Sequence, residues 1–381
     1  MSEKLRLRAL LTALAVLAGA LALAACGGDA GDDDEEEVQV AEAGPAQGKL
    51  VISNWPGYID TGPNGSVAEF EEKTGVDVDY IEDVNDNAQF FGKLQPQLQN
   101  GESGDRSIFV VTDWMAKQMY DLGYVQEINR DDVATVSENL APQFQTSNLD
   151  PDRKYSIPWQ SGMTGIWVDT SKAPDIRTVN DLFDPKYKGQ VTMLTEMRDT
   201  VPLVMKADGI DPTEASKEDW LAAIDKIKEA ADSGQIRRFT GNDYTEDLTS
   251  GNAVASIGWS GDAYLIGNKN AEWRMPTEGC MLWTDNMVIP VGAPNTGAAL
   301  EWMNFTYEPN VQADIAAFVN YVTPVAGVQE ILRKRDPALG NNQLIFPSED
   351  FTANCTAQVN PPGETEDVQE VTEAFEDVVS G

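Results

Sequence analysis

Histidine is absent from this chain of 381 residues. Its absence excludes catalytic triads and dyads built on an imidazole, imidazole ligands for metal ions, and histidine general bases. Basic residues are also scarce, since 27 lysines and arginines face 63 aspartates and glutamates, and the formal net charge is −36 at pH 7. Nucleic-acid binding needs clustered cations that neutralise phosphates, so we expect no nucleic-acid partner. The acidic excess instead favours cationic solutes, although solubility alone would also explain it.

The N-terminus has the organisation of an export signal. Three basic residues within the first eight positions precede an uncharged apolar run over 10–23, which is short for a membrane span. Leu23-Ala24-Ala25-Cys26 resembles a bacterial lipobox, in which the cysteine becomes the lipidated first residue of the mature chain. The alternatives are an ordinary secretory peptide with a chance cysteine, or a signal anchor. We predict a lipoprotein signal peptide over 1–25, and an extracytoplasmic protein held to the membrane only by lipid on Cys26, in the periplasmic space or on the outer face of the cytoplasmic membrane.

The next segment, 26–48, is poor in residues that could be buried. It contains six consecutive acidic residues over 32–37, which repel one another. We therefore predict an acidic flexible tether over 26–48.

With Cys26 assigned to lipid, two cysteines remain, Cys280 and Cys355. An oxidising compartment and an even number of thiols indicate one disulfide between them. The alternative is a pair of buried free thiols.

Apolar runs alternate with helical patterns along the rest of the chain, which favours an α/β fold with βαβ units and a mostly parallel sheet covered on both faces. The predicted strands are 49–55, 76–81, 108–111, 124–128, 155–158, 165–168, 189–194, 254–259 and 287–290. The predicted helices are 88–99, 114–122, 216–231, 297–307, one that starts at a capping box over 66–69, and one at the C-terminus. Two successive α/β units, with helices returning late in the chain, indicate two lobes joined by more than one crossing.

Aromatic and acidic residues gather where predicted strands begin or end. The five clusters are Trp55 with Tyr58, Asp113-Trp114, Glu196 with Asp199, Trp259 with Asp262, and Trp283 with Asp285. Ligands of α/β sheets bind at the carboxyl ends of strands. A single tryptophan at such a place is usually a core residue, but five clusters favour a binding site. A linear polyamine suits them, because carboxylates bind its ammonium groups and flat rings cover its methylenes. Sugars also stack on tryptophan and bind aspartate, so they are the competing ligand class.

Several segments together resemble spermidine/putrescine-binding proteins of ABC importers. They are Trp55 with Tyr58, Tyr155-Ser156-Ile157-Pro158-Trp159, Asp181-Leu182-Phe183-Asp184-Pro185-Lys186-Tyr187-Lys188-Gly189, Trp259 with Asp262, Trp283-Thr284-Asp285, and Tyr321-Val322-Thr323-Pro324. The resemblance implies a two-lobed type II periplasmic-binding-protein fold with an interlobe ligand cleft. Lobe 1 would comprise 49–161 and 285–325, and lobe 2 would comprise 162–284 and 326–381. The implied partners are a polyamine and an ABC transporter permease, and we expect a monomer.

The resemblance also implies roles for individual residues. Trp55, Tyr58, Trp259 and Trp283 match aromatic walls; Glu196, Asp199 and Asp285 match carboxylates that hold amines; Asp262 matches an acid of putrescine-preferring members; Thr112, Trp114 and Tyr321 match further residues of the cleft. The chain departs from the family at Pro56-Gly57, where relatives commonly carry a polar and then an acidic residue.

We therefore expect a solute-binding lipoprotein that captures spermidine, putrescine or a similar polyamine and is not an enzyme. A binding protein of the same fold for a sugar or another amine is the alternative. Glu196 and Asp199 would also fit the acid pair of an extracellular glycoside-active lipoprotein. We expect no cofactor and no metal: Asp83-Val84-Asn85-Asp86-Asn87 is similar to the opening of a calcium loop, but the required glycine and glutamate are missing, which favours a capped turn.

Overall fold

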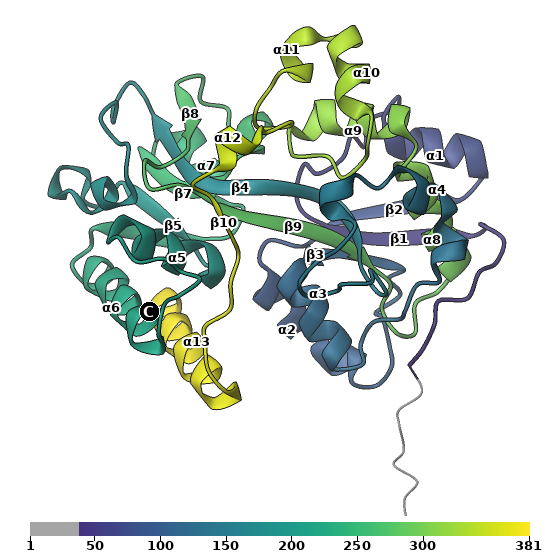
Figure 1. Ribbon diagram of the computed structural model, residues 1–381, viewed down its shortest axis with the longest axis horizontal. Helices are drawn as coiled ribbons and strands as arrows, with labels where there is room; N and C mark the ends of the chain where they lie inside the picture. The colour runs from purple at the N-terminus through teal and green to yellow at the C-terminus, as the bar shows by residue number, and fades with distance from the viewer. Residues whose placement is uncertain (1–37) are drawn as a thin grey trace, which may run out of the picture. The chain divides into compact units, whose positions relative to one another are not determined.

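One mixed sheet organises the part of the chain that the computed structural model describes, residues 38–381 (Figure 1). Its strands are β1 (Lys49–Asn54), β2 (Asp77–Glu82), β3 (Ile108–Thr112), β4 (Ile157–Asp169), β5 (Val191–Leu194), β6 (Ile236–Thr240), β7 (Ala255–Trp259), β8 (Ala271–Arg274), β9 (Met281–Val288) and β10 (Thr356–Ala357). They pair in the order β2-β1-β3-β9-β4-β7-β5-β6, with β10 on β9 and β8 on β4. The predicted signal peptide, Cys26 and the tether as far as residue 37 lie outside the described residues.

The helices are α1 (Ser66–Thr74), α2 (Asn87–Leu98), α3 (Asp113–Asp121), α4 (Ala134–Asn139), α5 (Met197–Ala207), α6 (Lys217–Asp232), α7 (Tyr244–Ser250), α8 (Thr296–Thr306), α9 (Pro309–Val319), α10 (Val328–Arg335), α11 (Pro337–Gly340), α12 (Glu349–Thr352) and α13 (Thr365–Ser380). Short 3-10 helices are η1 (Arg130–Val133), η2 (Pro142–Phe144), η3 (Val179–Phe183), η4 (Pro185–Tyr187) and η5 (Asp262–Tyr264). No helix within 38–381 is long and apolar enough to cross a membrane.

Strands β4 and β9 connect the two halves of the sheet. They lie side by side in Figure 1, between β1–β3 and the strands β5–β8. β4 pairs antiparallel with β9, with an irregularity between Pro158 and Gln160, and also antiparallel with β7. The expectation of a mostly parallel sheet is therefore wrong at its centre, where β3–β9, β4–β9, β4–β7 and β4–β8 are antiparallel. It holds at the sides, where β1–β2, β1–β3, β5–β6 and β5–β7 are parallel.

Two strand predictions differ from the structure for local reasons. The predicted strands 155–158 and 165–168 belong to the single strand β4, whose Pro158, Gly162 and Gly165 favour breaks in isolation. The predicted strand over 124–128 makes only isolated bridges, such as Val125 with Pro290. The edge strand β6 was not expected, because Arg237 and Arg238 are exposed and interrupt its apolar pattern.

Helix starts follow local capping chemistry. In α6, Ser216 and Asp219 form a reciprocal capping box, and Trp220 and Ile227 lie on its buried face. The capping box predicted at Ser66 is wrong, since Gly65 is the N-cap of α1 and makes no side-chain cap. Asp86 caps α2 by accepting from the Gln89 N–H at 2.8 Å, which confirms the predicted capped turn.

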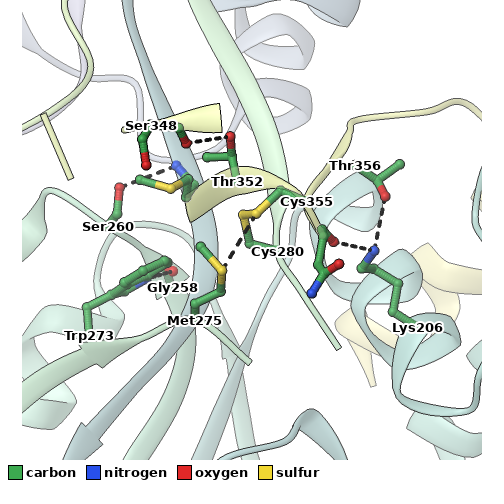
Figure 2. The surroundings of a disulfide bond; sticks show 12 residues. Lys206, Gly258, Ser260, Trp273, Met275, Cys280, Ser348, Thr352, Cys355 and Thr356 are labelled. Carbon is green, nitrogen blue, oxygen red and sulfur yellow. Dashed lines mark hydrogen bonds between the residues drawn. A yellow bond between two sulfur atoms is a disulfide. The ribbon is translucent and has the colours of Figure 1, made fainter. Parts of the chain in front are cut away.

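The predicted disulfide is present. Cys280 and Cys355 are joined with an S–S distance of 2.06 Å and a Cα–Cα distance of 4.3 Å (Figure 2). The bond connects the start of β9 to the start of β10 and closes a loop of 75 residues. In the chain-entropy description, a loop of this length stabilises the folded state by about 4 kcal/mol.

Candidate ligand-binding site

A small cavity gathers ten of the predicted site residues. They are Trp55, Tyr58, Thr112, Glu196, Asp199, Trp259, Asp262, Trp283, Asp285 and Tyr321. Most lie at the ends of strands: Trp55 follows β1, Thr112 ends β3, and Trp259 ends β7. Glu196 and Asp199 lie at the start of α5, just after β5, and Trp283 and Asp285 lie on β9. The sheet therefore brings together clusters that are far apart in the sequence.

The aromatic residues of the cavity contact one another edge to face. The ring centroids are 5.5 Å apart for Trp55 and Trp259, 5.2 Å for Tyr58 and Tyr321, and 5.3 Å for Trp283 and Tyr321. Trp259 and Trp283 complete the series at 6.4 Å. Each of these tilted contacts is favourable because a ring edge faces the electron-rich face of its neighbour. The five rings form a continuous apolar wall.

Two glycines leave space for this wall. A Cβ on Gly162 of β4 would lie 2.4 Å from the Trp283 ring, and a Cβ on Gly261 would lie 2.5 Å from the Tyr321 ring. Both distances are shorter than any real Cβ contact. These positions therefore tolerate no side chain unless the rings move.

We expect Gly261→Ala to lower the free energy of unfolding by about 1–3 kcal/mol, the usual cost of overpacking, because the Tyr321 ring has to shift. Chemical denaturation measures this change. The matched control is Gly92→Ala in α2, where a Cβ meets nothing within 4 Å and better helix propensity predicts a small gain. Equal stability of Gly261→Ala and the unmodified protein would contradict the packing of Tyr321 described here.

Asp285 is held by hydroxyl donors. The Tyr58 hydroxyl donates to its Oδ2 at 3.0 Å, and the Thr112 hydroxyl donates to its Oδ1 at 2.8 Å. Behind them, Nδ2 of Asn87 donates to Thr112 Oγ1 at 2.8 Å and to Glu196 Oε2 at 3.3 Å. One network therefore orients two of the cavity's carboxylates.

The other two carboxylates are also fixed by neutral donors. Asp262 accepts from Nδ2 of Asn242 at 3.0 Å and from the hydroxyls of Tyr244 and Tyr321. Asp199 accepts from Nε1 of Trp259 at 3.0 Å and from Nε2 of Gln358 at 2.8 Å. These hydrogen-bond donors are all neutral, so they orient the two carboxylates without adding a positive charge.

Burial raises the pKa of all four carboxyl groups. The pKa of Glu196 rises to about 8, that of Asp285 to about 7, and those of Asp199 and Asp262 to about 6. Desolvation is the largest cause in each case, and the hydrogen bonds to the aspartates oppose it. The described residues that line the cavity include no lysine or arginine. The cavity thus combines apolar walls with carboxyl groups that a bound cation would help to ionise.

Trp114 does not line this cavity, contrary to the prediction. It lies in a wider neighbouring groove, where the guanidinium carbon of Arg198 stacks 3.7 Å from its ring centroid. Asp113 points away from the cavity as well and accepts from Nδ2 of Asn286 at 2.6 Å.

Three amide side chains of the cavity were missed by sequence reasoning, namely Asn87, Asn242 and Gln358. Asn87 follows the helix cap Asp86, but its sequence context gives no sign of a ligand site, and the same holds for Asn242 and Gln358. Within 38–381, no three His, Cys, Asp or Glu side chains are grouped so as to hold a metal ion.

The sequence is similar to several characterised binding proteins. It is 25% identical to the spermidine/putrescine-binding periplasmic protein of Salmonella typhimurium over 335 residues, which cover 87% of this chain and 88% of that protein. It is 26% identical to the putrescine-binding periplasmic protein of Escherichia coli over 349 residues, covering 85% and 90% of the two chains.

The fold is similar to solved structures of this kind. A Listeria monocytogenes protein attributed to spermidine/putrescine ABC transport matches with a TM-score of 0.74 and 26% identity, over 87% of this chain and 98% of that one. A spermidine/putrescine ABC transporter substrate-binding protein of Streptococcus pneumoniae matches with a TM-score of 0.68 and 23% identity, over 87% and 98%. The predicted two-lobed periplasmic-binding-protein fold is confirmed. The model of the family described as bacterial extracellular solute-binding protein matches residues 65–341, and the chain therefore belongs to that family.

Proposed function

We propose that this protein captures a polyamine of the spermidine or putrescine type outside the cytoplasm and delivers it to an ABC importer. The observation that carries the proposal is the cavity itself, in which five aromatic rings and four buried carboxyl groups face one space. A polyamine alternates ammonium groups with methylenes. Carboxylates bind the former through charge-assisted hydrogen bonds, and aromatic faces cover the latter and attract the cations.

The relatives support the same ligand class. Proteins that align over more than four fifths of this chain are named for binding spermidine or putrescine. The alternative ligand, a sugar, presents no cationic group. A sugar offers no cation to the carboxyl groups of Asp285, Asp262 and Asp199, so these groups would stay protonated or carry a buried charge, which is costly at sites of low dielectric. Glu196 has a cationic partner of its own in Arg198, at 3.8 Å.

We propose that the two lobes have the boundaries expected from the sequence, 49–161 with 285–325 and 162–284 with 326–381. The cavity would then be lined from both sides, by Trp55, Tyr58 and Asp285 of lobe 1 and by Asp199, Trp259 and Asp262 of lobe 2. Ligand bound to both sides would favour the closed arrangement, because only that arrangement completes its contacts.

We also propose a lipid anchor on Cys26, a monomeric state and the absence of enzymatic activity.

The alternative of a glycoside-active protein would use Glu196 and Asp199 as its acid pair. In the structure, the oxygens of Asp199 accept hydrogen bonds from Trp259 and Gln358, which fix the carboxylate in one orientation. Carboxyl groups that bind amines explain the arrangement without a reaction.

We expect spermidine or putrescine to raise the melting temperature of the purified mature protein, whereas glucose and maltose leave it unchanged. At a ligand concentration one hundred times the Kd, binding adds about 2.7 kcal/mol to the free energy of unfolding. Calorimetric titration with a panel of polyamines, sugars and amino acids gives the affinities directly. A shift with a sugar and none with any polyamine would overturn the ligand assignment, and turnover of a glycoside would overturn the proposal that the protein is no enzyme.

A further inference from the structure

Residues 353–360, here called the strap, carry the chain from α12 past β9 towards α13 (Figure 1). Within the strap, β10 pairs in parallel with the first residues of β9. The Thr356 N–H donates to the Cys280 carbonyl at 2.9 Å, and the Gln358 N–H donates to the Leu282 carbonyl at 2.8 Å. The strap therefore runs alongside the strand that carries Trp283 and Asp285.

The strap reaches the ligand cavity through one side chain. Gln358 lines the cavity, and its Nε2 donates to Oδ1 of Asp199 at 2.8 Å. The other oxygen of Asp199 accepts from Trp259 of β7 at 3.0 Å. The orientation of this buried carboxylate thus depends on β7 and on the strap.

Hydrogen bonds and the disulfide hold the strap, which has little buried apolar surface; at its far end Nε of Arg198 donates to Oδ1 of Asn360 at 2.7 Å. Ala353, Asn354, Ala357 and Asn360 are exposed, and no residue of 353–360 is fully buried. Segments with so few buried apolar contacts open at a small free-energy cost. Cys355, three residues before Gln358, attaches the strap to Cys280 through the disulfide.

Two further contacts define where the strap lies. Nζ of Lys206 donates to the Asn354 carbonyl and to Thr356 Oγ1, both at 3.0 Å (Figure 2). On the other side, Gly279 has a φ of +99°, and a Cβ there would lie 1.8 Å from the Asn354 carbonyl oxygen. The backbones on both sides of the disulfide are therefore in direct contact at this glycine.

We propose that the Cys280–Cys355 disulfide is a positioning element of the ligand site: it holds the strap so that Gln358 orients Asp199, and ligand affinity depends on whether the bond is closed. This inference rests on the proposed function for its ligand. It assigns the disulfide a role in binding in addition to stability. Gln358 acts as a positioning residue through Asp199.

A double-mutant cycle with putrescine as the probe tests the coupling. We expect the paired substitution Cys280→Ser and Cys355→Ser to weaken binding about tenfold, and Gln358→Ala to weaken it by a similar factor. The triple variant should lose no more than the larger single effect, because both changes remove the same constraint on Asp199. Calorimetry at a temperature where circular dichroism shows folded protein gives the affinities. Gln369→Ala, an exposed glutamine on α13, is the matched control and should bind normally.

Three results would overturn the inference: unchanged affinity in the paired cysteine variant, unchanged affinity in Gln358→Ala, or losses that multiply in the triple variant. If the cysteine variant does not fold, Gln358→Ala with the disulfide intact still decides whether the strap matters for binding.

A readout without ligand separates this inference from the proposed function. Hydrogen exchange of the unliganded protein, before and after reduction, should show loss of protection at the Thr356 and Gln358 amides while the amides of β4 and β9 stay protected. Retained protection of the strap after reduction would contradict the inference. Failure of every polyamine to bind the oxidised protein would instead refute the proposed function.

Discussion

Acidification from pH 8 to pH 5 is expected to weaken polyamine binding at least about a hundredfold. The empty site has carboxyl pKa values of about 8 for Glu196, about 7 for Asp285 and about 6 for Asp199 and Asp262. At pH 5 these groups are protonated, whereas alkyl ammonium groups keep their charge up to about pH 10. Binding must then ionise the carboxyl groups, and each such group weakens affinity about tenfold per pH unit below its pKa.

Calorimetric titrations between pH 5 and pH 8, in buffers of different ionisation enthalpy, measure both the affinity and the protons released on binding. We expect net proton release near neutral pH. Affinity that is constant over this range, without proton release, would contradict the raised pKa values.

The same pKa values predict the stability of the empty protein. A carboxyl group whose pKa is higher in the folded than in the unfolded state stabilises the fold fully only below the unfolded value. That contribution is lost as the pH rises through the folded value. For Asp285 the window runs from about 4 to about 7. A bound polyamine should reverse this slope, because it favours the ionised form in the folded state.

Asp285→Asn is expected to weaken polyamine binding about ten- to a hundredfold. The substitution keeps the size of the side chain and removes the charge that faces an ammonium group, and a hydrogen bond between charged groups is worth about 1.5–3 kcal/mol. Tyr58 and Thr112 hold the two oxygens of the Asp285 carboxylate, so its position in the cavity is fixed before the ligand binds. Calorimetry on the folded variant measures the effect.

The control for this substitution is Asp225→Asn, which removes the same charge from an exposed position on α6 and should leave affinity unchanged. The empty Asp285→Asn protein should also gain stability relative to the unmodified protein as the pH rises from 4 to 7, since it lacks a buried carboxyl group that must ionise. Normal polyamine affinity in folded Asp285→Asn would remove Asp285 from the site.

Most of the site residues that could be predicted from sequence stand at or just after strands, although Tyr321 follows the helix α9. Trp259 ends β7 and Asp262 follows it by three residues, while Trp283 and Asp285 lie two apart on one face of β9. Strand ends meet at one edge of a sheet, so clusters of aromatic and acidic residues there indicate a shared site even before the sheet order is known. The same combinations, Trp259 with Asp262 and Trp283 with Asp285, are among the segments that resemble the polyamine-binding family.

What could not be predicted depends on tertiary contacts. Trp114 follows β3 as expected, but at the start of α3 it turns towards Arg198 instead of the cavity. Gln358 lies in a segment without periodicity, and only the disulfide and the pairing of β10 with β9 bring it to Asp199. The sequence did not predict β4 as one continuous strand, because glycines within a strand usually indicate a break. In the structure, Gly162 serves the packing of Trp283 and Tyr321.

The edge-to-face contacts among the cavity's rings carry a consequence for discrimination between large and small cations. In the structure these rings contact one another, with centroids 5.2–6.4 Å apart along the series from Trp55 to Tyr58. A ligand that separates any of these ring pairs loses about 0.5–1.5 kcal/mol for each pair. A lone ammonium ion offers no apolar surface in return, whereas a chain of methylenes restores the lost contacts along its length. The contacts among the rings therefore disfavour binding of small cations relative to polyamines.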